Sequence, residues 1–225
     1  MNADVISVFI KSKFMIMKTL RYILIVFMLI TILASYSQIP ITNHQVITLQ
    51  SVPDHASAKL LSESKQILLR RLTSMNLRNV QITQNNSASE LVITVGDTIS
   101  YATLTETLLA QGSISFKVDS IQVLNQDDIL EAHADFVNPL QPTLCITFKE
   151  KVQKLFEDIT IHNLNKPLAF IVDNKVYAAP RIMDKISHGK ISLLGSGFSK
   201  TEVRKLVAII SSGLLPLKFT TVSDN

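Results

Sequence analysis

The 225-residue sequence contains one cysteine, Cys145, and no tryptophan. A single cysteine cannot close a disulfide within the chain, so a disulfide-stapled scaffold is excluded. Cys145 is also far from the N-terminus, which excludes it as a lipoprotein attachment site. It lies in the apolar run Leu144–Phe148, and we interpret it as a small buried hydrophobic residue rather than a reactive thiol.

Metal-ligand patterns are also missing. None of the five histidines has a second histidine, a cysteine or a carboxylate at the spacing that metal sites use. These histidines are His44, His55, His133, His162 and His188. We therefore expect no metal site and no cofactor, and we interpret the histidines as surface or loop residues.

The sequence shows no catalytic constellation. The acidic residues Asp127, Asp128 and Glu131 are better explained by helix capping and by the helix dipole than by acid–base chemistry. The stretch Gly195–Lys200 lacks the spacing of a phosphate-binding loop. Ser211 and its neighbour Ser212 lack the Gly-x-Ser-x-Gly context of a nucleophile. We expect that the protein is not an enzyme.

The charge distribution argues against nucleic-acid binding. The formal net charge is +4, but residues 1–37 hold four basic residues and one acidic residue. Without them, 18 basic and 17 acidic residues remain, a net charge of +1. No basic patch is left to bind phosphates.

The N-terminal segment has the pattern of an export signal. The basic stretch Lys18–Arg21 precedes an apolar run over Tyr22–Ala34, and Ser35–Ser37 then offers the small residues that a signal peptidase reads. We interpret residues 1–37 as a signal peptide cleaved before Gln38, with an uncleaved membrane anchor as the alternative. Either interpretation predicts that the remainder of the chain is exported across a membrane.

The first half of the remaining chain has the pattern of a ferredoxin-like fold. Apolar residues alternate in some segments and recur at helical spacing in others, in the order β-α-β-β-α-β. The expected elements are Val46–Leu49, Ala56–Met75, Asn79–Thr83, Glu90–Val95, Tyr101–Ala110 and Ser113–Val118.

The second half predicts a further α+β unit. Its expected elements are a capped turn at Asp127–Asp128, a strand at Leu144–Thr147, a helix opened by Thr147 and Glu150, a hairpin at Leu168–Ala179, a strand at Ile191–Leu194, a helix from Ser199 to Gly213 and a strand at Leu217–Val222. Ser199 with Glu202 forms a capping-box pattern, and Gly213 suits a left-handed helix end.

Several motifs of this half resemble one known family. The apolar strand Leu168–Val172 leads into the turn Asp173–Lys175, and the returning strand ends at Ala179-Pro180. Gly197-Phe198-Ser199 then precedes a helix that closes with Gly213–Pro216. In this order and spacing, the motifs resemble the head of the first periplasmic domain of SecD, the accessory subunit of the bacterial protein-export translocon.

The resemblance implies a domain organisation and a role. The fold class is α+β, with a ferredoxin-like base of residues 38–118 plus 214–225 and an inserted head of residues 119–213. By this resemblance the chain is a non-catalytic periplasmic module that binds unfolded or translocating polypeptide. It would assist protein export or folding, with the Sec translocon or other envelope proteins as partners. The alternative is an envelope interaction protein that reuses the head fold to dock one folded partner.

Three apolar residues are the candidate polypeptide-binding site. Ile182, Met183 and Ile186 follow Pro180 in a loop-like stretch, where no periodicity forces them into a core. Flexible Met and Ile side chains at a surface suit the binding of varied extended apolar segments. The alternative is that these residues fill the head's own core.

The chain also departs from the SecD pattern. No apolar span follows the N-terminal segment, and the Gly-Gly motif expected near Val46–Pro53 is missing. We therefore expect contact with the membrane only through the N-terminal segment, if it is uncleaved. We expect no proton-driven pulling by this chain alone.

Overall fold

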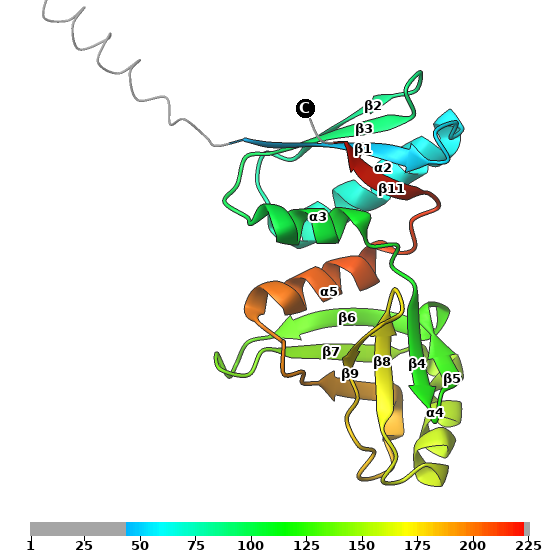
Figure 1. Ribbon diagram of the computed structural model, residues 1–225. Helices are drawn as coiled ribbons and strands as arrows, with labels where there is room; N and C mark the ends of the chain where they lie inside the picture. The colour runs from blue at the N-terminus through cyan, green and yellow to red at the C-terminus, as the bar shows by residue number, and fades with distance from the viewer. Residues whose placement is uncertain (1–43, 223–225) are drawn as a thin grey trace, which may run out of the picture. The chain divides into compact units, whose positions relative to one another are not determined.

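The computed structural model describes residues 44–222, which lie within one compact unit. The predicted signal peptide, residues 1–37, lies outside the described residues. Within residues 44–222, the chain forms four α-helices and three antiparallel sheets (Figure 1). No helix in this range is both long enough and apolar enough to cross a membrane. The mixed α+β class expected from the sequence is confirmed.

The first sheet has the strand order β11-β1-β3-β2. Its strands are β1 (Gln45–Val52), β2 (Gln81–Asn85), β3 (Glu90–Val95) and β11 (Lys218–Val222). Helices α2 (Ala58–Ser74) and α3 (Tyr101–Leu109) share its hydrophobic core, which includes Leu49, Leu68, Ile93, Leu104 and Phe219. We call this cluster the first core. The order is consistent with a ferredoxin-like base in which β11 is the closing strand.

One strand of the predicted base lies elsewhere. The strand expected at Ser113–Val118 is present as β4 (Ile114–Val118), but it pairs with β5 (Ile121–Asn125) and β8 (Leu168–Val172) rather than with the first sheet. The expectation that it closes the first sheet is wrong. Its buried residues, Ile114, Phe116 and Val118, belong to a second hydrophobic cluster, and β11 pairs with β1 instead.

Two further sheets enclose this second core. One has the order β10-β7-β6 and the other β5-β4-β8-β9. Their remaining strands are β5 (Ile121–Asn125), β6 (Ile129–Asp135), β7 (Thr143–Phe148), β8 (Leu168–Val172), β9 (Lys175–Ala178) and β10 (Lys190–Leu193). Helices α4 (Glu150–His162) and α5 (Lys200–Ser212) and the short 3-10 turns η1 (Gln126–Asp128) and η2 (Ser187–Gly189) complete this part.

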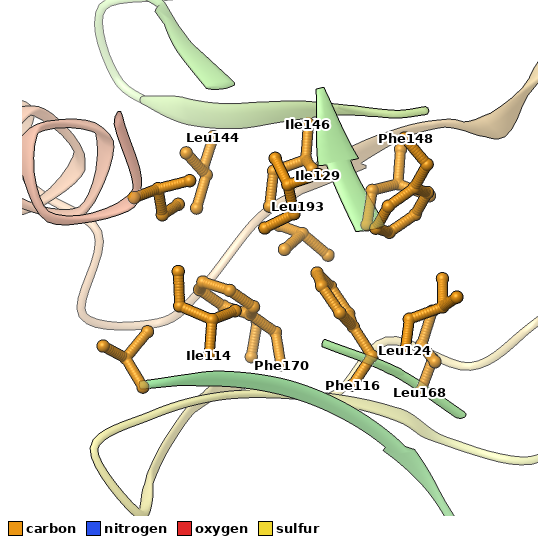
Figure 2. Close-up of a cluster of buried hydrophobic side chains, with 14 of the residues drawn as sticks. Ile114, Phe116, Leu124, Ile129, Leu144, Ile146, Phe148, Leu168, Phe170 and Leu193 are labelled. Carbon is orange, nitrogen blue, oxygen red and sulfur yellow. The ribbon is translucent and has the colours of Figure 1, made fainter. Parts of the chain in front are cut away.

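Aromatic side chains fill the space between these two sheets. Figure 2 shows residues of β7 pointing toward residues of β4 and β8. The ring of Phe116 packs edge-on against Phe148, with 5.1 Å between the centroids, and lies 5.4 Å from Phe170. All three are fully buried, so the alternating pattern of each strand is explained by one shared core.

Some of the predicted turn and helix-cap residues are confirmed, and one is not. The hairpin turn at Asp173 and Asn174 is confirmed, with φ of 48° and 67°, which suits the twist of a two-residue hairpin. Ser199 accepts a hydrogen bond of 3.1 Å from the backbone N–H of Glu202, as expected of an N-cap. The helix opening expected at Thr147 is wrong, because Thr147 is still in β7 and the helix begins after Lys149.

Two short connectors join the parts that hold the two cores. The backbone N–H of Leu215 donates to the carbonyl of Gln111 at 2.8 Å. The Gln111 side chain donates in turn to the carbonyls of Leu215 and Leu217, at 2.8 and 3.0 Å. The outgoing and returning chains are therefore hydrogen-bonded to each other where they pass between the cores.

Candidate functional site

The three predicted site residues lie in different environments. Ile182 is 3% exposed and belongs to the second core. Ile186 is half-buried and packs against the same core, whereas the Met183 side chain is 76% exposed. Of the three, only Met183 is open to direct contact over most of its surface, and Ile182 mainly supports the segment from inside.

Backbone hydrogen bonds hold this segment in place. The carbonyl of Ile182 accepts from the N–H of Asn165 at 2.8 Å, and the N–H of Ile182 donates to the carbonyl of Lys166 at 3.0 Å. The N–H of Ile186 donates to the hydroxyl of Thr160, on α4, at 2.9 Å. The segment is therefore anchored at both ends, and Met183 lies between the anchors.

A hollow of about 210 Å³ lies between this segment and strand β10. Ile182 and Ile186 line one part of it, and all four residues of β10 line another. The full lining consists of Leu168, Pro180, Arg181, Ile182, Ile186, Lys190, Ile191, Ser192 and Leu193. The structure thus brings two of the three predicted residues to one apolar hollow.

Strand β10 is an edge strand. It pairs with β7 on one side, and no other strand among residues 44–222 pairs with its second side. Ile191 and Leu193 point into the second core, while Lys190 and Ser192 are exposed. An unpaired strand edge presents backbone donors and acceptors that another extended segment can use. Sequence reasoning missed this edge, because strand order is not visible in local patterns.

The charged groups at the hollow are basic. Arg181 and Lys190 line it, and its lining in the described structure includes no Asp or Glu. Arg181 donates to the carbonyl of Asn165 at 2.7 Å, which holds its guanidinium near the segment. Lys185 pairs with Glu157 at 3.7 Å. The chemistry available here is an apolar floor, a strand edge and a cationic rim, which suits the binding of an extended apolar segment.

Cys145 lies on the opposite strand, β7, in register with Ser192. It is a free thiol of intermediate exposure, and its Sγ is 3.7 Å from the hydroxyl of Ser192. It is therefore less buried than the interpretation as a core residue required.

A second polar site lies between the cores and was not expected from the sequence. Arg71 of α2 is fully buried, and burial lowers the pKa of its guanidinium to about 10. It donates to the carbonyls of Thr107, Ala110 and Gly213 at 2.9, 2.6 and 3.2 Å. These carbonyls lie at the ends of α3 and α5, where helices leave acceptors without intrahelical partners. Arg71 therefore donates hydrogen bonds to unpaired carbonyls at the ends of two helices.

A lysine of α5 makes an ion pair with a glutamate of α3. The ammonium of Lys205 donates to Glu106 of α3 at 2.7 Å and lies 2.9 Å from Glu202. Burial lowers the pKa of Lys205, but the hydrogen bonds to Glu106 and Glu202 outweigh it, and the net shift is upward. Both polar sites connect helices, and Glu106 and Lys205 also line a pocket of about 330 Å³ together with Asp173, Lys175 and Tyr177.

Within residues 44–222, no three His, Cys, Asp or Glu side chains cluster closely enough to hold a metal ion.

These features define a two-core α+β module with a free strand edge beside an apolar hollow. A family model described as SecDF, P1 head subdomain, matches residues 102–217, which is more than half of the chain. The chain belongs to the SecDF P1 head family.

Curated relatives agree over a wider stretch. The chain is 26% identical over 184 residues to the protein translocase subunit SecD of Acidaminococcus fermentans, covering 81% of this chain and 44% of that protein. It is 28% identical over 178 residues to SecD of Calditerrivibrio nitroreducens, covering 77% of this chain and 33% of that protein. The chain thus spans less than half the length of these relatives.

Two solved structures show the same fold. SecDF in a super-membrane-facing form is similar with a TM-score of 0.62 and 18% identity, over 79% of this chain and 29% of that chain. A structure of SecDF described as a membrane component that enhances protein export has a TM-score of 0.60 and 18% identity. The match covers 80% of this chain and 99% of that chain.

Proposed function

We propose that this chain is an exported SecD-like module that holds extended polypeptide and assists protein export or folding. The observation that carries the proposal is the free edge of β10 beside an apolar hollow, in a member of the SecDF P1 head family. The module works without catalysis and without its own proton coupling. Its partners are translocating polypeptide and the Sec translocon or other envelope proteins.

The mode of binding follows from the strand edge. An extended segment adds to β10 as a further strand, and its main chain pairs with the unused groups of Lys190–Leu193. Main-chain pairing depends little on sequence, so many clients can bind. Alternate side chains of the client enter the hollow between β10 and Ile186, and Met183 adapts at its rim.

The proposed organisation has two working parts. The head comprises residues 119–213 together with β4, and the base comprises the first sheet with α2 and α3. The N-terminal segment, residues 1–37, directs export to the periplasm, and the module acts there.

The proposal is tested by titrating the protein with a labelled, permanently unfolded polypeptide and with the same polypeptide in its folded form. We expect saturable binding of the unfolded form only. Met183→Asp and Ile186→Asp should each weaken binding, because each replaces an apolar side chain that contacts the client with a charged one.

A matched control is Ile121→Asp, which replaces an apolar residue of similar exposure on the edge strand β5 of the other sheet. It should leave binding unchanged. Binding of the folded form alone, to saturation, would support a dedicated folded partner and overturn the polypeptide-holding role.

A further inference from the structure

The loop between β6 and β7 carries the two most exposed large apolar side chains of the described chain. Val137 is 90% exposed and Leu140 is 91% exposed. They lie on a loop that projects beyond the ends of its two strands (Figure 1). A convex apolar tip cannot enclose a ligand. It is better suited to insert into a deformable surface that can close around the tip.

Three backbone donors of the tip are hydrogen-bonded within the loop and its flanking strand. The N–H of Val137 donates to the carboxylate of Asp135 at 2.8 Å, and the N–H of Leu140 donates to the side chain of Asn138 at 3.0 Å. The N–H of Gln141 donates to the carbonyl of Asn138 at 3.1 Å. Moving a backbone group out of water costs free energy mainly when the group is unpaired. These three N–H donors already have hydrogen-bond partners.

Cationic side chains stand beside the tip. Phe136 precedes Val137, and its ring lies under the ammonium of Lys200 at 5.9 Å and the guanidinium of Arg204 at 5.3 Å. The loop itself contains no acidic residue, and the carboxylate of Asp135, the last residue of β6, is engaged by the N–H of Val137. An exposed apolar tip with flanking cations is complementary to an anionic lipid surface.

We propose that the β6–β7 tip is a membrane-interface contact, in which Val137 and Leu140 enter the headgroup region of an anionic leaflet. Lys200 and Arg204 face the lipid phosphates at the same time. This surface differs from the strand edge at β10, and its test does not depend on polypeptide binding.

The absence of tryptophan gives a clean test in the full chain. Leu140→Trp places a single fluorescent reporter on the tip. Ile121→Trp places the same reporter at an exposed position of β5, as the control. Each variant is mixed with vesicles of pure phosphatidylcholine or of phosphatidylcholine and phosphatidylglycerol in equal parts. The N-terminal segment is present in every sample, so its contribution is the same for both reporters.

With anionic vesicles we expect a blue-shifted emission for Leu140→Trp and a roughly threefold loss of quenching by acrylamide. Lipids brominated on their chains should quench this reporter, and high salt should reverse the effect, because exposed charges are screened. Lys200→Glu with Arg204→Glu should abolish it. Ile121→Trp should show none of these changes.

Three results would overturn the proposal. The first is equal acrylamide quenching of Leu140→Trp with and without anionic vesicles. The second is an emission shift that needs no lipid and grows with protein concentration, which would assign the tip to a second copy of the chain. The third is an identical response of the control reporter.

Discussion

The guanidinium Nε of Arg71 donates a hydrogen bond of 3.0 Å to the hydroxyl of Ser212, across 141 positions of the sequence. Arg71 belongs to α2, which packs on the first core, and Ser212 ends α5, which packs on the second. One buried cation therefore connects the two cores of the module. Buried arginines usually need a carboxylate, and here the charge of Asp173 and the dipoles of helix carboxyl ends both supply negative potential.

Replacing this residue should destabilise the whole module. Arg71→Met leaves the carbonyls of Thr107, Ala110 and Gly213 buried without their donor. We expect the free energy of unfolding to fall by roughly 2–5 kcal/mol, because each unsatisfied buried acceptor is costly. Urea denaturation followed by circular dichroism measures the loss.

Lys59→Met is the matched control, because Lys59 lies on the same helix with an exposed side chain. It should change the free energy of unfolding by less than about 0.5 kcal/mol. Equal losses in the two variants would show that Arg71 does not hold the junction.

Gly112 should resist substitution by alanine. Its φ is +86°, and an added Cβ would lie 3.0 Å from the carbonyl oxygen of Gly213 and 3.3 Å from the guanidinium of Arg71. Gly112→Ala should therefore cost about 1–3 kcal/mol of unfolding free energy through strain and crowding. Gly197→Ala is the control, because nothing lies within 4 Å of its added Cβ. A midpoint of thermal unfolding that falls no further for Gly112→Ala than for Gly197→Ala would contradict this.

The ion pair between α3 and α5 should make stability depend on acid pH. The hydrogen bond from Lys205 lowers the pKa of Glu106 below its ordinary value of 4.5. A carboxylate with a lowered pKa in the folded state stabilises that state above its unfolded pKa. This contribution is lost as the pH falls through the lower, folded value.

Glu106→Gln tests this dependence. Near neutral pH the variant should be less stable than the parent chain by less than about 1 kcal/mol, because the Glu106 side chain is largely exposed and screened. The difference should vanish once the pH is below the folded pKa of Glu106. Denaturation midpoints at a series of pH values measure it, and a gap that stays constant into acid would refute the assignment.

Local chemistry predicted part of the fold well. The hairpin at Asp173–Asn174 could be predicted because turn residues with positive φ have few substitutes. The helix beginning after Ser199 could be predicted because its cap and its apolar face agree. In both segments the neighbours in sequence determine the structure.

Long-range pairing could not be predicted in the same way. The alternation in Ile114–Val118 indicates a strand but not which sheet receives it, and β4 pairs with β8, more than fifty positions later. Burial in the loop after Pro180 was equally hidden, because Ile182 is covered by elements distant in sequence. The burial of Arg71 could not be predicted either, because the helix ends to which it donates come from other parts of the chain.

The central claim is that extended polypeptide binds by adding to the free edge of β10. The most direct measurement compares one apolar peptide of eight residues with two copies that are N-methylated at every second residue. The two copies differ in register, so each lacks the main-chain donors on a different edge. Methylation removes the main-chain donors on one edge and leaves the side chains in place. We predict that the unmodified peptide binds and that the copy methylated on its pairing edge binds at least roughly tenfold more weakly. Equal affinity of the unmodified peptide and of both methylated registers would contradict strand addition at β10.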